Sequence, residues 1–156
     1  HLNNKLILDI NEYKERLIAV LESNKDLYVI ARTDSSDFDI ALERVVEYSK
    51  MGADAVLIEG ITSHAQIPLI RNVINEKVDI AINLIAGGKT DPINMTMLND
   101  FGINIVNYST PCLFSAHKAI NLSLDKLLDN DGMLIVEKDD IALKENSAFL
   151  DDSDKK

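Results

Sequence analysis

Four short apolar segments recur along the chain, and stretches with helical spacing lie between them. The apolar segments are residues 27–33, 55–58, 80–82 and 103–106, and continuous apolar runs of this kind are typical of strands that are buried on both faces. In the intervening stretches, apolar residues recur every three or four positions, which predicts amphipathic helices. Because strands that alternate with helices form parallel sheets, the pattern predicts an α/β fold.

Residues that favour helix ends lie beside these stretches. Asn11 and Asp37 are predicted to cap the first two helices, and Gly52 is predicted to end the second. Ser63 is predicted to cap a third helix, which tolerates Pro68 only within its first turn. A helix is therefore expected before the first strand and after each of the four strands.

The strands recur about every 25 residues, which is the spacing of the units in a (β/α)₈ barrel of ~250 residues. Four units are half of such a barrel, whereas an open flavodoxin-like sheet normally has five strands. We therefore predict the C-terminal half of a TIM-type barrel over residues 1–132, followed by a partly disordered C-terminal tail at 133–156. The chain starts at His1 rather than at a methionine, and together with the missing units this predicts a piece of a longer protein.

Composition excludes several classes of function. The 26 acidic and 16 basic residues give a formal net charge of −10, which repels polyphosphate backbones and argues against nucleic-acid binding. No apolar run reaches the roughly 18 residues of a membrane span. The single cysteine, Cys112, excludes an internal disulfide, which fits a reducing compartment and predicts a cytoplasmic protein.

Polar side chains follow each predicted strand. Arg32 ends the first strand, Glu59 and Asn83 follow the second and third, and residues 107–109 (Asn-Tyr-Ser) follow the fourth. In a barrel these positions converge at the carboxyl face. The Arg32 fork suits a carboxylate or phosphate, the Glu59 carboxylate can accept a hydroxyl hydrogen, and the Asn83 amide can donate to an oxyanion. Each residue alone also fits a surface ion pair or a turn, but four such ends in succession favour a site for a small carboxylic acid.

A glycine-rich loop follows the third strand. Gly87 and Gly88 would let backbone N–H groups approach an anion closely. The sequence Gly88-Lys89-Thr90 imitates the end of a P-loop, but Asn83 occupies the position where the P-loop motif needs its first glycine. We therefore reject nucleotide binding.

Taken together, these motifs resemble the isocitrate lyase/phosphoenolpyruvate mutase superfamily, in particular its small methylisocitrate and 2,3-dimethylmalate lyases. The resemblance covers most of the chain up to about residue 125. At the N-terminus, His1, Leu2 and Lys5 resemble the end of the family signature Lys-Lys-Cys-Gly-His-Leu-x-x-Lys. The other matching segments are Ala31-Arg32-Thr33-Asp34, Ala41-Leu42-Glu43-Arg44, Gly52-Ala53-Asp54-Ala55, Glu59-Gly60 and the loop from Asn83 to Thr90.

The resemblance implies a Mg²⁺-dependent lyase that cleaves a carbon–carbon bond of a 2-hydroxy or 2-oxo diacid or triacid by a retro-aldol step through an enolate. It implies that the Mg²⁺ ligands and a catalytic lysine–cysteine pair lie in an N-terminal half, so that this chain alone would be inactive. It also implies a homo-oligomer formed through the last barrel helix, residues 113–127. The implied catalytic residues are His1, Arg32, Glu59 and Asn83, and the implied substrate-binding residues are Arg32, Asn83, Gly87 and Gly88.

Two departures from the family pattern leave other functions open. Ala86 stands where many small lyases have glutamate, and residues 107–111 read Asn-Tyr-Ser-Thr-Pro where many have Tyr-Pro. One alternative is an oxaloacetate decarboxylase or a phosphonate-cleaving or mutase relative; Lys-x-Cys-Gly directly before His1 would favour the lyase instead. Another alternative is a non-catalytic, truncated half-barrel.

Overall fold

The computed structural model describes residues 6–23, 26–136 and 140–153. Residues 151–153 are described by their backbone alone. His1 lies outside the described residues. The chain divides into two compact units, His1–Pro111 and Cys112–Lys156. The described part of the first unit contains α1 (Ile10–Ser23), β1 (Ile30–Thr33), α2 (Phe38–Met51), β2 (Ala55–Ile58), α3 (Gln66–Val73), β3 (Asp79–Leu84), α4 (Met95–Asp100) and β4 (Ile105–Tyr108).

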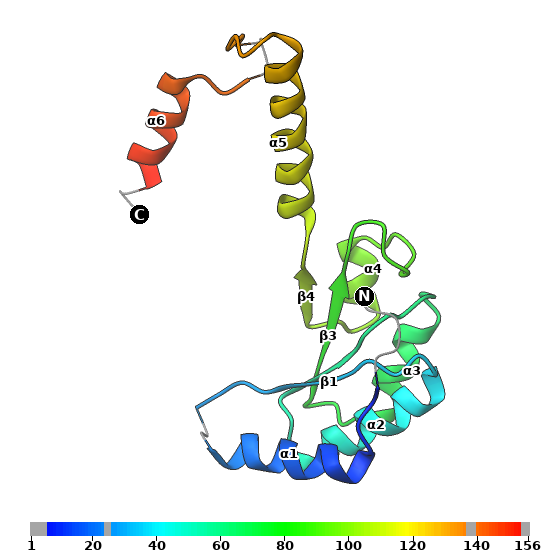
Figure 1. Ribbon diagram of the computed structural model, residues 1–156. Coiled ribbons are helices and arrows are strands. Elements are labelled where there is room, and N and C mark those ends of the chain that lie inside the picture. Colours follow the sequence, from blue (N-terminus) through cyan, green and yellow to red (C-terminus); the bar gives the residue numbers. More distant parts are fainter. Residues whose placement is uncertain (1–5, 24–25, 137–139, 154–156) are drawn as a thin grey trace. The chain divides into compact units, whose positions relative to one another are not determined.

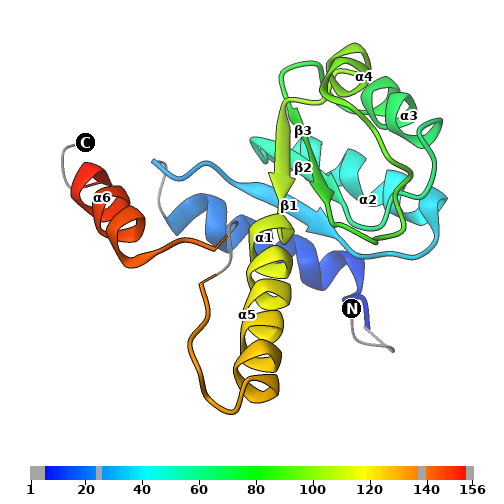
Figure 2. The ribbon, with the colours of Figure 1, turned by 90° about the horizontal axis from the view of Figure 1, so that it is seen from above.

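The strands form a parallel sheet in the order β1-β2-β3-β4 (Figure 1). Each connection moves one strand further in the same direction, and right-handed crossovers of this kind place every connecting helix on the same face of the sheet. Figure 2 shows α2, α3 and α4 gathered on one side of the strands. This is the arrangement of successive units in a (β/α)₈ barrel, and the predicted fold, half of a TIM-type barrel, is confirmed.

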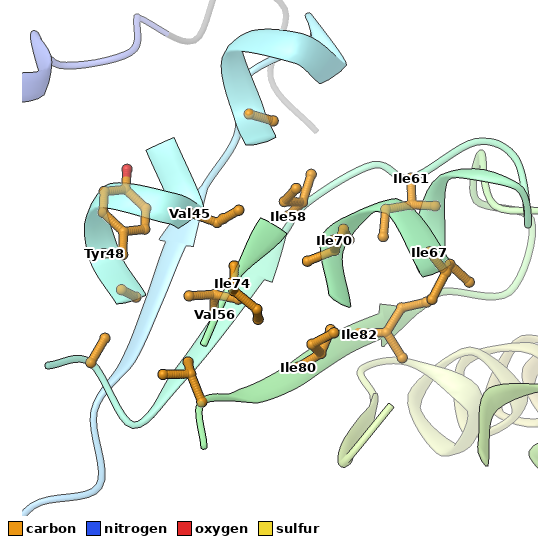
Figure 3. Close-up of a cluster of buried hydrophobic side chains, with 14 of the residues drawn as sticks. Val45, Tyr48, Val56, Ile58, Ile61, Ile67, Ile70, Ile74, Ile80 and Ile82 are labelled. Atoms are coloured by element: carbon orange, nitrogen blue, oxygen red, sulfur yellow. The ribbon is translucent and has the colours of Figure 1, made fainter. Parts of the chain in front are cut away.

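The core lies between the sheet and these helices (Figure 3). Alternate strand residues point into it, as the period of two in a strand requires. Those residues are Ala31, Val56, Ile58, Ile80 and Ile82, and they pack with Val45 and Tyr48 of α2, Ile67 and Ile70 of α3 and Leu98 of α4. Residues between them in sequence, such as Arg32 and Leu57, therefore face the opposite side of the sheet.

Several predicted element ends are confirmed and others are wrong. Asp37 caps α2 by accepting hydrogen bonds from the next amides, and Gly52 ends α2 with a left-handed φ of 96°, a conformation that glycine adopts without strain. The Asn11 cap is wrong, because α1 already begins at Ile10 and the Asp9 carboxylate accepts the Asn11 amide at 2.8 Å. Asp9 is therefore the residue that caps α1.

The start of α3 also differs from the prediction. The helix begins at Gln66, and its cap residue, Ala65, offers no side-chain hydrogen bond. The Ser63 hydroxyl accepts the Ala65 amide at 3.3 Å, so Ser63 caps the turn that leads into α3, and the Gln66 side chain accepts the amides of Thr62 and Ser63 at 2.9 and 3.1 Å. Pro68 is the third residue of the helix, within the first turn, as predicted.

The second unit contains α5 (Pro111–Asp129) and α6 (Leu143–Ser153). Proline at the first position of α5 costs no hydrogen bond, because that N–H would have no partner within the helix. The helix α6 differs from the prediction, because the sequence indicates a partly disordered tail there. The predicted boundary at residue 132 stays a prediction. Within the described residues, no helix combines the length and the apolar character needed to cross a membrane.

Candidate active site

Polar side chains from all four strands meet at the carboxyl end of the sheet, on the face opposite to the core. The register pairs Asn83 with Asn107. It also pairs Leu57 with Ala81, so Glu59, two residues beyond Leu57, lies in the same row as Asn83. Because side chains two residues apart share a face, the three polar groups form one line across β2, β3 and β4.

These groups are joined by a continuous set of hydrogen bonds. The amide nitrogen of Asn83 donates to both carboxylate oxygens of Glu59, each at 3.3 Å. The Nδ2 of Asn107 donates to Asn83 Oδ1 at 3.2 Å, and the hydroxyl of Ser109 donates to the same oxygen. On the β1 side, Arg32 Nη2 lies 3.3 Å from Glu59 Oε2. The structure thus brings together Arg32, Glu59 and Asn83, the predicted site residues that lie at the strand ends.

Arg32 is held by two carboxylates. Its Nε and Nη2 donate to the two oxygens of Asp34 at 2.5 and 3.0 Å, while Glu59 lies on its other side. The hydrogen bond to Asp34 and the charges of both carboxylates hold the pKa of Arg32 above its usual value. The arginine side chain is 45% exposed, whereas that of Glu59 is only 9% exposed. The Arg32 guanidinium is therefore accessible to solvent, whereas the Glu59 carboxylate beside it is nearly buried.

Residues of α1 and α2 contact the backbone of β1 and each other. The Tyr13 hydroxyl accepts the Arg32 amide at 3.2 Å, and the Tyr13 ring stacks on Tyr48 with centroids 4.5 Å apart. The buried Arg44 guanidinium lies 5.5 and 5.9 Å from the two ring centroids. It donates to the Tyr48 hydroxyl and to the carbonyl of Leu8, both at 3.0 Å. The motif Ala41-Leu42-Glu43-Arg44 thus stabilises the helices that hold Arg32 in place.

Not every polar residue at a strand end belongs to the site. Thr33 is only 3% exposed and points into the core. The Tyr108 hydroxyl lies against Met95 Sδ, at 3.4 Å, on the helix side of the sheet. Asp34, Asn107 and Ser109 also lie at the site, although no role is predicted for them from the sequence. Asp34 lies two residues after Arg32, Asn107 pairs with Asn83, and Ser109 lies two residues after Asn107. Because residues two apart in a strand share a face, this spacing is the signal that could have found them.

The glycine-rich loop is only partly consistent with anion binding. Gly87 has a positive φ of 72°, and the Gly88 amide donates to the Ile85 carbonyl at 2.9 Å. That amide therefore closes the turn. The Thr90 hydroxyl donates to the Ile61 carbonyl at 2.6 Å, which fixes the end of the loop against the segment after β2. Substrate binding by the loop glycines stays a prediction.

The described residues do not fit a magnesium site by themselves. They contain no group of three His, Cys, Asp or Glu side chains placed to hold a metal ion. The two carboxylates at the strand ends, Asp34 and Glu59, are both engaged with Arg32. A cation between them would have to compete with the guanidinium charge.

A parallel half-barrel with an arginine, carboxylates and amides at its strand ends has its polar groups where enzymes of the TIM-barrel class hold their active sites. The family described as phosphoenolpyruvate phosphomutase matches residues 2–128. The chain belongs to this family, within the isocitrate lyase/phosphoenolpyruvate mutase superfamily, as the motifs indicated.

Individual relatives and structures agree with this placement. The chain is 30% identical to 2-methylisocitrate lyase of Bacillus subtilis over 76% of its own length and 40% of the relative's. It is 29% identical to 2,3-dimethylmalate lyase of Eubacterium barkeri, over 84% and 46% of the two lengths. The chain therefore spans less than half the length of these curated relatives.

Solved structures show the same fold. A crystal structure of 2,3-dimethylmalate lyase superposes with a TM-score of 0.85 at 25% identity, covering 99% of this chain and 54% of that one. A phosphonopyruvate hydrolase in complex with oxalate and Mg²⁺ superposes with a TM-score of 0.76 at 19% identity, over 99% and 57% of the two chains. At that identity, the second match shows a shared fold alone.

Proposed function

We propose that this chain is the substrate-binding half of a carbon–carbon lyase that acts on a 2-hydroxy or 2-oxo diacid or triacid. The observation that carries the proposal is the line of polar groups at the carboxyl end of a half-barrel, in which Arg32 forms an ion pair with Glu59 and Glu59 accepts hydrogen bonds from Asn83. These are the residues that the family resemblance implies for the site. The names of the relatives, 2-methylisocitrate lyase and 2,3-dimethylmalate lyase, supply the first substrates to test.

Each residue then has a distinct role. Arg32 binds a substrate carboxylate with Nη1, the end of its fork that makes no hydrogen bond with the described residues, while Asp34 holds Nε and Nη2. Glu59 is almost buried and receives donors from two sides, so it acts as a fixed acceptor for a substrate hydroxyl. Asn83 donates its amide to a substrate oxygen. Retro-aldol cleavage converts the hydroxyl-bearing carbon to a carbonyl, leaves the bonding electron pair on the adjacent carbon and releases the hydroxyl proton to a base.

The implied metal does not find its ligands among the described residues. We therefore propose that Mg²⁺, which would stabilise the electron pair left by bond cleavage, is held by an N-terminal half-barrel. The lysine–cysteine pair would lie in the same region, just before His1, and the implied catalytic His1 would come from this chain. On this view the chain is inactive without that half.

The test uses the product of the complete reading frame that encodes these residues, here called the full-length protein. Cleavage of 2-methylisocitrate and 2,3-dimethylmalate is followed by release of the 2-oxo acid. Arg32→Lys keeps the charge but removes the planar fork, so kcat/KM should fall about 10- to 100-fold, the size expected for a charge-assisted hydrogen bond. The matched control is Arg16→Lys, an exposed arginine of α1 that pairs with Glu12, and it should behave as wild type.

The alternatives give different results in the same assay. Full kcat/KM in Arg32→Lys would refute the proposed carboxylate clamp. Two other results, each without cleavage of either hydroxy acid, would favour the alternatives. Release of the 2-oxo acid from a phosphonate or of CO₂ from oxaloacetate would place the protein with the phosphonate-cleaving relatives or the decarboxylases, and conversion of the phosphonate to an enol phosphate would place it with the mutases. No turnover of any of these compounds would favour a non-catalytic half-barrel.

The remaining expectations concern partners and location. We propose a homo-oligomer formed through α5, because that helix carries exposed apolar side chains at helical spacing, among them Leu113, Ile120 and Leu124. We also propose a cytoplasmic location, on the ground of the single cysteine. Sedimentation of the full-length protein would measure the oligomeric state directly.

A further inference from the structure

The side-chain amide of Asn83 has a single favourable orientation. Its oxygen accepts one hydrogen bond from Asn107 Nδ2 and another from the Ser109 hydroxyl. An amide oxygen has two lone pairs, so both are used. The nitrogen points to the opposite side and faces both oxygens of Glu59 at 3.3 Å.

The charge of Glu59 explains why the amide cannot be reversed. A flipped Asn83 would place its oxygen against the Glu59 carboxylate and its nitrogen against the nitrogen of Asn107. Both contacts would be repulsive, in a place where Glu59 is only 9% exposed and solvent screens little. Arg32 reinforces the same polarity, since Nη2 approaches the carboxylate from the β1 side at 3.3 Å. The Asn83 amide thus donates to Glu59, the positive charge of Arg32 lies beside the same carboxylate, and Asn107 donates to Asn83.

We propose that Asn107 and Ser109 are positioning residues that hold Asn83 as a hydrogen-bond donor to the ligand. With its oxygen doubly occupied, Asn83 can offer only N–H. The ligand atom beside Asn83 must therefore be an acceptor, such as a carboxylate or carbonyl oxygen, and a hydroxyl hydrogen is directed to Glu59 instead. The identity of the ligand rests on the proposed function, whereas the orientation of the amide does not.

Asn107 and Ser109 can be changed without disturbing the core. Both are exposed, and both lie on the face of the sheet opposite to the buried cluster. Among the described residues, their side chains form hydrogen bonds with each other and with Asn83. A loss of activity on substitution would therefore report on Asn83 rather than on folding.

The first test compares two substitutions of similar size in the full-length protein. Asn107→Asp replaces the donor with an acceptor and favours the flipped amide, whereas Asn107→Leu only removes the donor. We expect kcat/KM for 2,3-dimethylmalate to fall about 10- to 100-fold in Asn107→Asp and several-fold less in Asn107→Leu. Asn99→Asp, the same change at an exposed asparagine of α4, controls for added charge. A structural role for Asn107 predicts the opposite order, with leucine at least as damaging as aspartate, and that order would overturn the proposal.

Ser109 supplies an independent arm. Ser109→Ala removes one of the two donors to Asn83 Oδ1 and should lower kcat/KM about 3- to 10-fold. Ser109→Thr keeps the hydroxyl and should restore most of that loss. If threonine rescues nothing, the hydroxyl does not act through Asn83.

A spectroscopic arm decides the orientation even if the protein cleaves none of the tested acids. In ¹⁵N-labelled full-length protein, the Asn83 Nδ2 signals are assigned by their loss in Asn83→Asp. They should shift on Glu59→Gln in an otherwise wild-type protein, because the nitrogen faces that side chain. In an Asn107→Asp background the same Glu59→Gln change should leave them nearly unmoved, because the nitrogen has turned toward β4. Equal shifts in both backgrounds would refute the positioning role, whereas absence of turnover alone would refute only the proposed function.

Discussion

Arg44 should be among the most costly residues to replace in this chain, although it does not touch the candidate site. Its guanidinium is 7% exposed and links α2 to α1 and to the segment before it. Arg44→Met keeps an apolar, unbranched stem like that of arginine but removes the guanidinium, and with it the charge and every donor. The buried Tyr48 hydroxyl and the Leu8 carbonyl then each lose their hydrogen bond from Arg44.

The expected loss of stability follows from these contacts. A hydrogen bond to a charged donor contributes about 1.5 kcal/mol or more, and Arg44 makes one to Tyr48 and one to Leu8. Each cation–π contact, with Tyr13 and Tyr48, adds about 0.5 to 1 kcal/mol, and the better burial of methionine offsets part of the total. We therefore expect the free energy of unfolding to fall by about 3 kcal/mol.

Urea denaturation of the full-length protein, followed by circular dichroism, measures this change from the unfolding midpoint and slope. Lys50→Met is the matched control, because Lys50 lies on the same helix, is 68% exposed and forms an exposed ion pair with Glu47; it should change stability by less than about 0.5 kcal/mol. A loss below about 1 kcal/mol in Arg44→Met would refute the reasoning, since it would mean that the buried acceptors find other partners at little cost.

Two further predictions concern α2. Gly52→Ala should lower the free energy of unfolding by about 1 kcal/mol, because φ is +96° and no atom lies close enough to an added Cβ to contribute; denaturant midpoints would show it, and an unchanged midpoint would contradict the strain argument. The hydrogen bond from Lys14, assisted by Lys50, lowers the pKa of Glu47 from 4.5 to about 2. A lowered pKa stabilises the fold fully above pH 4.5, and that contribution is lost as the pH falls toward 2. Glu47→Gln should therefore flatten the decline of stability between pH 4.5 and 2, which acid titration of the melting temperature measures, and an unaltered acid profile would argue against the ion pair.

The resting state of Arg32 changes how its role is understood. The sequence suggested a guanidinium fork ready for a substrate carboxylate, but the structure shows Nε and Nη2 already bound to Asp34. A ligand carboxylate would meet Nη1 or displace Asp34. Glu59, which follows the neighbouring strand β2, lies 3.3 Å from Arg32 Nη2. This ion pair keeps the guanidinium near the row of polar groups that Glu59, Asn83 and Asn107 form.

The sequence by itself determined the order of the elements and most of their ends. Apolar runs and helical spacing depend on which residues face the core, and they indicated the strands and most of the helices, including β2 at Ala55–Ile58 and the caps Asp37 and Gly52 of α2. The same local reasoning failed where a neighbour competed for a helix end. Asp9 took the place of Asn11, and α3 begins only at Gln66, although the Ser63 hydroxyl still accepts the Ala65 amide.

Only the tertiary structure decided which polar residues form the site. In the sequence, Thr33 follows Arg32 and Tyr108 follows Asn107, so all four lie at strand ends. Because side chains alternate along a strand, Thr33 and Tyr108 point toward the helices, whereas Arg32 and Asn107 point to the opposite face of the sheet. The register of the parallel strands then aligned Glu59, Asn83 and Asn107 in one row. Residues about 24 positions apart became hydrogen-bonded neighbours, because adjacent strands lie about 4.8 Å apart whatever the length of the chain between them.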